Sequence, residues 1–487
     1  MIVHPDADLL PRKALLIGDR RFDTASGGTH RHIYAATGRP TADIPLAGAA
    51  EVDLAVEAAR NASTIWSQMP RNERRDCLIR MAHLLREHAA ELTQLSVIDN
   101  SIAIATQQYG GHVAADLFLY NAGWTDKIGG DVIPTWPGNA LDYTLDEPFG
   151  VVAVIIPWNG PVYALGMVLA PALAAGNTVV VKPPELAPYA ALRFAELCLE
   201  AGMPPGTVNM IPGGPEAGAA LTSHPGVDKI SFTGSGNTAR HILTSAQKRL
   251  TPVQLELGGK SASIVFDDAD LEAWSPYGLA GIVNNVGQGC INPTRVVVQR
   301  GIYAEVLARL EAAAVGLRIG DPTDPTTVIG PVVDDRAVTR IMGMIDRANA
   351  SGARLLTGGA RGKGDLAEGY FIEPTVFADV APDSELAQHE VFGPVLAVTP
   401  FDTEDEAIKL ANGTEFSLAA YAWTRDLKRA HRCARSLVAG NVWINGFTGI
   451  PGSAPFGGMG ESGVGRLGGI YGIREFTRPK NVWIGLD

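Results

Sequence analysis

The chain has 487 residues, 46% hydrophobic and 19% charged, the ordinary balance of a globular protein that is too long for one simple core. Its formal net charge of −12 argues against nucleic acid or an anionic membrane surface as the main partner.

Four scattered cysteines, without CxxC spacing, favour a reducing compartment over a disulfide framework or a zinc site. No cluster of metal ligands is visible in the sequence. The N-terminus lacks the features of a signal peptide, and no long apolar run predicts a membrane span. We therefore expect a cytoplasmic protein without a metal.

The first 150 residues change character several times. Residues 31–37 alternate loosely, as in a strand or hairpin arm. Helical periodicity covers 51–98 as two helices, and 116–128 predict a third. Three prolines then mark 131–148 as an exposed arm.

From Gly150 onward, short apolar runs alternate with helical segments. The expected strands are 151–156, 178–181, 208–211 and 229–232, and the expected helices are 163–175, 190–201 and 216–224. This alternation predicts parallel βαβ units in a doubly wound sheet. Right-handed crossovers place the loops after the strands along one edge, where ligands bind.

A second α/β region begins near Lys260. Its expected strands are 263–266, 294–299, 375–377 and 395–398, its expected helices are 271–285, 304–314 and 337–351, and 476–486 could form a closing strand.

A carboxylate and a thiol, Glu256 and Cys290, lie in two glycine-rich stretches. Glycine lets a backbone approach a ligand closely, and a carboxylate could serve as the base for thiol chemistry. The alternative is a glycine-rich crossover with a buried Glu and an inert Cys, because free cysteine is often buried. This stretch alone supports both interpretations equally.

Polar side chains follow two of the expected strands. Asn159, after the first strand, could donate its amide to a developing oxyanion, although a simple proline-rich turn explains this motif better when it is taken alone. Lys182 and Glu185 suit the two hydroxyls of a ribose, and the carboxylate would repel a 2′-phosphate, which favours NAD over NADP. The alternative for this pair is a solvated surface ion pair.

The segment 232–239 follows the fourth expected strand and opens a helix, whose N-terminal N–H groups attract phosphate. Its match to GxGxxA is weak on its own, so the strand-loop-helix context carries this prediction. The segments 390–395, 455–458 and 463–466 could each be ordinary turns.

The order of these motifs is more specific than any one of them. Pro-Trp-Asn at 157, Lys-Pro-Pro-Glu at 182, Phe-Thr-Gly-Ser at 232, Glu-Leu-Gly-Gly-Lys at 256, Gly-Gln-x-Cys at 287, Glu-Val-Phe-Gly-Pro at 390 and Pro-Phe-Gly-Gly at 455 occur together. This set resembles the aldehyde dehydrogenase superfamily, of the non-acylating type, over essentially the whole chain.

The resemblance implies a Rossmann-like, doubly wound cofactor domain, an α/β catalytic domain and a small β oligomerisation arm. The implied bounds are 1–125 with 149–258 for the first, 259–473 for the second, and 126–148 with 474–487 for the arm. The arm would extend a neighbour's sheet in a homodimer or homotetramer.

The resemblance also implies residue roles. Cys290 would attack the aldehyde carbon, Asn159 and the Cys290 N–H would hold the oxyanion, and Glu256 would activate the hydrolytic water. The cofactor would contact Ile155, Pro157, Trp158, Lys182, Glu185, Gly214, Phe232, Gly234, Ser235, Leu257, Gly258, Glu390 and Phe392. The substrate tunnel would be lined by Gly160, Tyr163, Met167, Ile291, Phe447 and Ile450. This wall is mostly apolar and lacks Arg, so we expect a hydrophobic or neutral aldehyde and not a dicarboxylic semialdehyde.

The chain departs from the family pattern at Gly236, Ala239, Gly460, Leu467 and Gly160. Gly236 replaces a Thr and would loosen the phosphate loop, and Gly160 replaces a ring and would widen or reshape the tunnel.

The expected function is oxidation of an aldehyde to its acid with NAD, and NADP is the alternative cofactor. The competing functions are a coenzyme A-acylating enzyme, a cysteine esterase and a non-catalytic NAD-binding protein on the same fold. Glu256 argues against the acylating enzyme because a base for water is retained.

Overall fold

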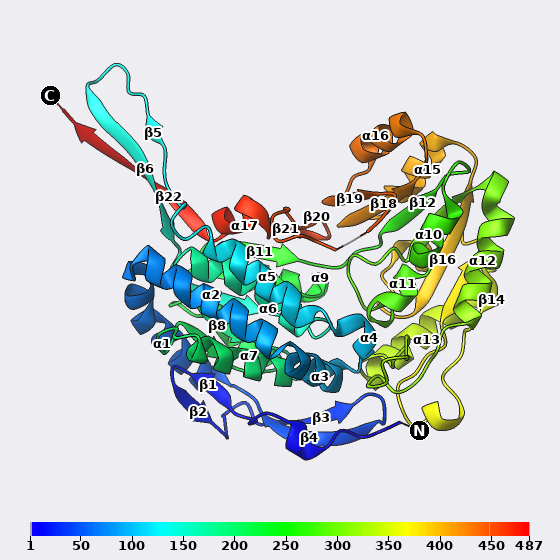
Figure 1. Ribbon diagram of the computed structural model, residues 1–487, viewed down its shortest axis with the longest axis horizontal. Coiled ribbons are helices and arrows are strands. Elements are labelled where there is room, and N and C mark those ends of the chain that lie inside the picture. Colours follow the sequence, from blue (N-terminus) through cyan, green and yellow to red (C-terminus); the bar gives the residue numbers. More distant parts are fainter. Residues whose placement is uncertain (1, 448, 487) are drawn as a thin grey trace.

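The computed structural model describes residues 2–447 and 449–486 as two α/β units with a projecting β-arm (Figure 1). One unit is built on an eight-stranded sheet and the other on a seven-stranded sheet. The expected α/β class with a doubly wound sheet is confirmed. None of the helices within these ranges combines the length and apolar character needed to cross a membrane.

The eight-stranded sheet has the order β2-β1-β9-β8-β7-β10-β11-β21. Its strands are β1 (Leu15–Ile17), β2 (Arg20–Phe22), β7 (Val151–Ile155), β8 (Thr178–Lys182), β9 (Val208–Met210), β10 (Lys229–Thr233), β11 (Val253–Glu256) and β21 (Gly463–Val464). The five strands from β9 to β11 are parallel, and β1 and β21 flank them antiparallel. All residues of β7 and β8 are buried, which explains their continuous apolar runs.

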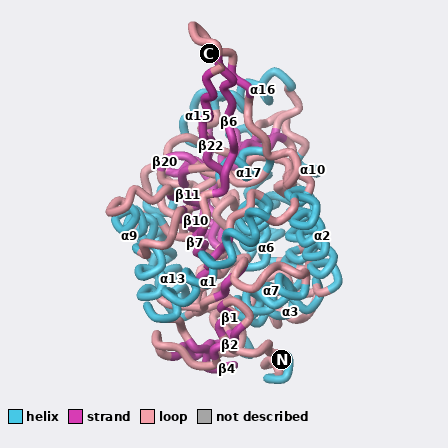
Figure 2. Tube along the Cα trace, turned by 90° about the vertical axis from the view of Figure 1, so that its left-hand side faces the viewer, coloured by secondary structure: helices cyan, strands magenta, loops and turns pink. Residues whose placement is uncertain are grey.

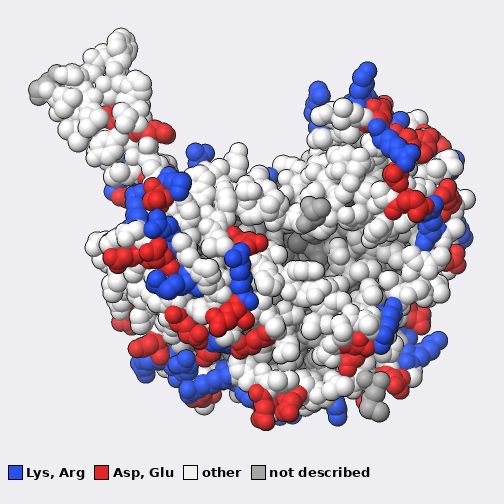
Figure 3. All heavy atoms as spheres, in the orientation of Figure 1, with Lys and Arg blue, Asp and Glu red and all other residues white. Residues whose placement is uncertain are grey.

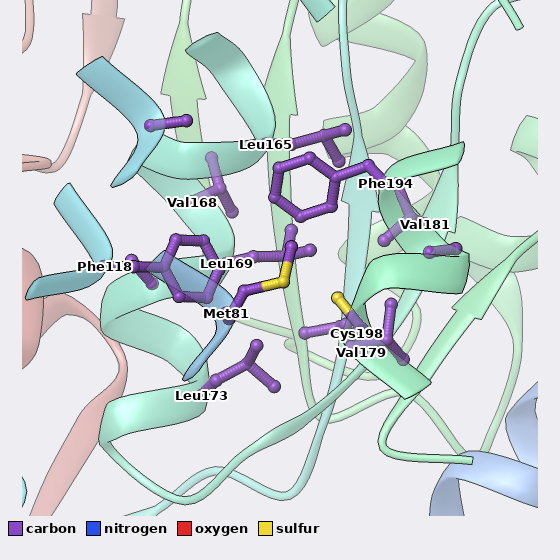
Figure 4. Packing of buried hydrophobic residues seen from close by; sticks show 14 of the residues in the cluster. Met81, Phe118, Leu165, Val168, Leu169, Leu173, Val179, Val181, Phe194 and Cys198 are labelled. Atoms are coloured by element: carbon purple, nitrogen blue, oxygen red, sulfur yellow. The ribbon is translucent and has the colours of Figure 1, made fainter. Parts of the chain in front are cut away.

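Helices cover both faces of this sheet (Figure 2). The helices of this unit are α1 (Ala49–Gln68), α2 (Arg71–Glu87), α3 (Ala89–Asn100), α4 (Ile104–Gln107), α5 (Gly110–Ala122), α6 (Pro161–Ala174), α7 (Tyr189–Glu200), α8 (Pro215–Ser223) and α9 (Gly236–Ala246). Side chains of α2, α5, α6 and α7 interlock over β8, with Phe118, Leu169 and Phe194 among them (Figure 4).

The helix expected at 116–128 is present but its bounds are shifted, because α5 begins at Gly110 and ends at Ala122. A Cβ atom on Gly111 would lie 2.9 Å from the Ala89 Cα. This glycine therefore permits close packing of α5 against α3 and does not break the helix.

The seven-stranded sheet has the order β14-β15-β16-β13-β12-β18-β19, with β19 on its outer edge. Its strands are β12 (Ala262–Val265), β13 (Arg295–Gln299), β14 (Arg354–Thr357), β15 (Thr375–Ala378), β16 (Val395–Phe401), β18 (Ala419–Trp423) and β19 (Asn441–Ile444), and its helices are α10 (Leu271–Gly278), α11 (Ala280–Val283), α12 (Tyr303–Val315), α13 (Asp335–Ala350), α14 (Glu385–Gln388), α15 (Glu404–Ala411) and α16 (Leu427–Ser436). Only β14 runs antiparallel to its neighbour among these strands.

The single helix expected at 271–285 is broken. It divides into α10 and α11, and the chain then turns through left-handed backbone at Asn285 (φ 52°) and Val286 (φ 57°). A β-branched residue in this region is an outlier, so packing of the surrounding loop must enforce the turn.

The arm consists of β5 (Val132–Ile133), β6 (Ala140–Pro148) and β22 (Thr477–Gly485). Both the exposed excursion and the closing strand were expected from the sequence. The full length of β22 pairs antiparallel with β6, from Thr477 opposite Pro148 to Gly485 opposite Ala140. The remaining elements are the hairpin of β3 (Thr29–Tyr34) and β4 (Arg39–Pro45), the pair of β17 (Phe416–Ser417) and β20 (Met459–Gly460), and α17 (Gly469–Glu475).

Candidate active site

The two glycine-rich stretches come together where the two units join. Glu256 is the last residue of β11, and Cys290 lies in the loop that leads into β13. A Cβ atom on Gly259 would overlap the carbonyl oxygen of Cys290, so only glycine fits this crossing. The predicted carboxylate and thiol therefore lie on two segments in direct backbone contact.

The Glu256 residue is buried, with only 3% of its surface exposed. Its Oε1 accepts a hydrogen bond from Gln254 Nε2 at 3.0 Å, and Gln254 in turn accepts one from Ser231 at 2.7 Å. Its Oε2 has no hydrogen-bond partner among the described residues. Burial raises the pKa of Glu256 well above the usual range, and the nearby Arg466 partly opposes this. A carboxyl whose pKa is raised in this way is a stronger base than an ordinary glutamate, which suits it to accept a proton.

Cys290 is partly exposed as a residue, but its sulfur is surrounded by protein, and this burial raises its pKa to about 12, aided by the negative charges of Glu390 and Glu256. The thiol is therefore protonated at neutral pH. Because the thiolate is the nucleophile, attack by this sulfur requires a base to remove its proton.

Asn159 lies against the loop of Cys290. Its side-chain amide donates to the Gln288 carbonyl at 2.8 Å. An amide nitrogen carries two N–H donors, so one remains for a ligand. The backbone here is held from two sides, since Asn285 Nδ2 donates to the Asn159 carbonyl at 2.9 Å and Asn100 Nδ2 donates to the Trp158 carbonyl at 3.1 Å.

Replacing Asn285 by glycine is expected to lower kcat/KM about tenfold or more, because the Asn159 carbonyl loses its tether. Glycine also relieves the positive φ at this position, so the melting temperature should not fall. Steady-state kinetics and a thermal melt separate the two effects. Full activity in this variant would show that the tether does not position Asn159.

The residues expected at the nicotinamide also gather here. Trp158 and Phe392 form an edge-to-face pair with centroids 5.5 Å apart. Glu390 accepts a hydrogen bond from the Gly259 N–H at 3.0 Å, and a Cβ atom on Gly258 would lie 2.5 Å from Glu390 Oε2. Burial raises the pKa of Glu390 to about 7.

The expected adenosine side lies along the carboxyl edge of the eight-stranded sheet. Lys182 is buried at the end of β8 and donates to the Gly213 carbonyl at 2.5 Å, and burial lowers its pKa to about 8. Beside it, half-buried Glu185 follows the two prolines. Gly214 caps α8, and a Cβ atom there would meet nothing within 4 Å, which leaves room for a ligand.

The segment expected to hold phosphate opens α9. Ser235 is the N-cap and accepts a hydrogen bond from the Thr238 N–H at 3.3 Å. The Gly234 N–H donates to the Glu256 carbonyl at 3.0 Å, which links this loop to the buried carboxyl. Ile155 and Phe232 are paired neighbours on β7 and β10, Pro157 follows the end of β7, and Leu257 follows the end of β11.

Most of the expected tunnel residues lie together. Tyr163, Met167, Ile291, Ile450 and Cys290 belong to or pack against one apolar cluster. Phe447 stands apart from it in an aromatic group with Trp443 and Tyr421, and a Cβ atom on Gly160 would meet open space.

Sequence reasoning did not single out Gln254, Asn285, Gln288, Tyr421 or Arg466. The Tyr421 hydroxyl donates to the Ile291 carbonyl at 2.9 Å, next to the nucleophile, and its ring stacks on Trp443 with centroids 5.1 Å apart. The only sign of this residue in the sequence was one tyrosine in the apolar run 418–423, which contains β18. Gln288 lies in the Cys290 motif itself and Asn285 lies two residues before it, and both were available as polar residues of unassigned role.

Lys260 was quoted in the motif without a role. Its side chain is buried, its ammonium has no hydrogen-bond partner among the described residues, and burial lowers its pKa to about 7. Within the same ranges, no group of three His, Cys, Asp or Glu residues is placed to hold a metal ion.

A thiol, a buried carboxyl and an amide meet beside a doubly wound sheet whose carboxyl edge carries helix N-termini and a buried lysine. This combination defines a cysteine enzyme built around a dinucleotide-binding sheet.

The family model described as the aldehyde dehydrogenase family matches residues 22–482, and the chain belongs to this family. Betaine aldehyde dehydrogenase of Cereibacter sphaeroides is 39% identical over 98% of this chain and 98% of that protein. The NAD+ complex of an aldehyde dehydrogenase from Bacillus cereus has a TM-score of 0.96 at 38% identity, covering 100% of this chain and 99% of that one. An NADP-dependent enzyme of E. coli has a TM-score of 0.95 at 36% identity, covering 99% of each chain. The expected family and fold are confirmed, and the protein is an NAD(P)-dependent aldehyde dehydrogenase.

Proposed function

We propose that this enzyme oxidises a hydrophobic or neutral aldehyde to its carboxylic acid, with NAD as hydride acceptor and Cys290 as nucleophile. The observation that carries the proposal is the crossing at Gly259, which brings the segment of the buried Glu256 carboxyl against that of the thiol. We assign 1–125 with 149–258 to the cofactor domain and 259–473 to the catalytic domain.

The residues act in sequence. Glu256 takes the thiol proton and the Cys290 sulfur attacks the aldehyde carbon, while the free Asn159 N–H and the Cys290 backbone N–H hold the oxyanion. NAD, when bound, would supply the acceptor for the hydride that this carbon loses, and the acyl group then remains on Cys290 as a thioester. Once Glu256 has released the first proton to solvent, it takes a proton from water, which attacks the thioester and releases the acid, and the Cys290 sulfur leaves as the thiolate. These roles make one carboxyl the base for both halves of the reaction.

The residues present fit a bound dinucleotide. The space beside Gly214, the buried Lys182 ammonium and the N-terminus of α9 lie along one sheet edge, as the ribose and pyrophosphate require. Lys182 and Glu185 would hold the adenosine ribose, Ser235 and Trp158 the pyrophosphate, and Glu390 and Phe392 the nicotinamide end.

Replacing Glu185 by glutamine is expected to raise the NADP-to-NAD ratio of kcat/KM about tenfold, because the like charge facing a 2′-phosphate is removed. The measurement is steady-state kinetics with both cofactors at one saturating aldehyde concentration. Glu216→Gln, an exposed acid on the first turn of α8, is the matched control. An unchanged ratio in the Glu185 variant would contradict this assignment.

The substrate class follows from the surroundings of Cys290. Met167, Ile291 and Ile450 offer apolar contacts, and the nearby carboxyls of Glu256 and Glu390 would repel an anionic substrate. An aldehyde panel with both cofactors, followed by reduced-cofactor absorbance, tests the proposal. Ester hydrolysis without NAD, a coenzyme A-dependent product, or cofactor binding without any aldehyde oxidation would each overturn it and point to one of the competing functions.

We further propose that the arm, 126–148 with 474–487, joins protein copies into a homodimer or homotetramer. Trp136 is 90% exposed and Trp483 is 55% exposed, and the arm is mostly uncharged on the face seen in Figure 3. Such apolar surface is typical of an interface. The outer edge of β19 offers a neighbour's sheet that the arm could extend. The four free cysteines support a cytoplasmic location.

Changing both Trp136 and Trp483 to glutamate is expected to convert the assembly to monomers, because two charges would then be buried at the interface. Light scattering after gel filtration measures the mass. An unchanged mass would place the interface elsewhere.

A further inference from the structure

Tyr163 is an unusual residue in the wall of the site. It lies on the first turn of α6, four residues after Asn159. Its hydroxyl group is buried and has no hydrogen-bond partner among the described residues. A buried hydroxyl without a partner is costly, and such groups in a native structure need an explanation.

A second buried tyrosine nearby shows what a purely structural hydroxyl does. The Tyr421 hydroxyl donates to the Ile291 carbonyl at 2.9 Å, so its hydrogen-bonding capacity is used within the protein. Tyr163 packs against the same apolar cluster as Cys290 and Ile291, but its hydroxyl finds no carbonyl. Its donor is therefore available to a molecule that enters the site.

The surroundings of the Tyr163 hydroxyl define what it can bind. Cys290 and Glu256 are the titratable groups close enough to act on it, so it faces the reacting centre. Gly160, three residues earlier in the chain, would have nothing within 4 Å of an added Cβ, which leaves space beside the ring. The carboxyls of Glu256 and Glu390 near Cys290 disfavour an anion in that space.

We propose that the Tyr163 hydroxyl is a specificity determinant, donating a hydrogen bond to an uncharged oxygen that the substrate carries near its aldehyde group. The oxygen is that of a hydroxyl, ether or carbonyl group. This inference rests on the proposed aldehyde oxidation and narrows its substrate class. It explains why a phenol, and not a phenylalanine, stands in an otherwise apolar wall.

The test uses pairs of aldehydes of the same shape, with and without the oxygen. Methoxyacetaldehyde and butanal form one pair, and 3-methoxybenzaldehyde and 3-ethylbenzaldehyde form a second in which the oxygen lies farther from the carbonyl. In Tyr163→Phe, kcat/KM is expected to fall about tenfold more for the oxygen-bearing member of at least one pair. Comparing each aldehyde between the two enzymes cancels its intrinsic reactivity.

Tyr421→Phe is the matched control, because its hydroxyl bonds to the protein. It should affect both members of each pair to the same extent. The melting temperature of Tyr163→Phe should be equal to or above that of the wild type, since an unpaired buried hydroxyl is removed. Equal losses for both members of both pairs, or no loss at all, would overturn the inference. Failure of the wild type to oxidise any of the four aldehydes with NAD would instead count against the proposed function.

Discussion

Replacing Cys290 by alanine is expected to lower aldehyde oxidation by a factor of about a thousand or more, because no other group can form the tetrahedral adduct from which hydride leaves. The residue is partly exposed and packs at the edge of an apolar cluster, so loss of its side chain should leave the fold and NAD binding intact. Reduced-cofactor absorbance measures turnover, and cofactor fluorescence quenching measures binding.

Cys433→Ala provides the control for this result. Cys433 is a buried thiol in a separate apolar cluster of the seven-stranded-sheet unit, and its loss should leave turnover largely unchanged. Substantial oxidation in the Cys290 variant would show that the nucleophile lies elsewhere.

The second large effect is expected from Glu256→Gln. Without the carboxylate, the thioester cannot be hydrolysed, so kcat should fall about a hundredfold or more. If another base still removes the thiol proton, each active site should produce about one reduced cofactor in a burst before turnover stops. Mass spectrometry should then find an acyl group on Cys290. A steady-state rate equal to that of the wild type would exclude Glu256 as the base for water.

The pH dependence of turnover by the wild-type enzyme should also show that Glu256 acts as a base. A base acts when deprotonated, and the pKa of Glu256 is raised, so turnover should fall as pH drops through that raised pKa, well above the usual glutamate range. The folding stability should change with pH in the opposite sense to turnover. Because the folded-state pKa lies above the unfolded-state value, stability should decline as pH rises between the two. Glu256→Gln should remove this contribution, which thermal melts across pH can detect.

Eight interior strands were predicted, β7 to β10 in one sheet and β12, β13, β15 and β16 in the other, because parallel strands covered on both faces are continuously apolar. The interior strand β18 was not predicted, although all of its residues are buried. The strand β11 was not predicted, because Gln254 and Glu256 interrupt its apolar pattern. Both side chains are nevertheless buried and bonded to each other, which a pattern of single residues does not reveal. The edge strand β19 is only half-buried, and its alternation is correspondingly weak.

In the active site, too, some residues could be predicted from the sequence and others could not. Glu256, Cys290 and Asn159 could be selected because each is a reactive or polar side chain among glycines or at a strand end. The hydrogen bond from Asn285 to the Asn159 carbonyl could not be predicted. It depends on a left-handed turn inside a segment whose apolar spacing favours helix. The free hydroxyl of Tyr163 was equally hidden, since a missing partner is a property of the folded surroundings and not of the sequence.

The last strands of the chain have a consequence for synthesis on the ribosome. β21 completes the sheet edge beside Glu256, and β22 covers β6 from more than 300 positions away in the sequence. Contacts this distant form only after the whole chain has emerged. A chain cut short before Gly463 would leave one edge of β11 open and would leave β6 without its partner in the arm. Catalysis and assembly thus both require the same C-terminal segment, so an unfinished chain should neither turn over substrate nor enter an oligomer.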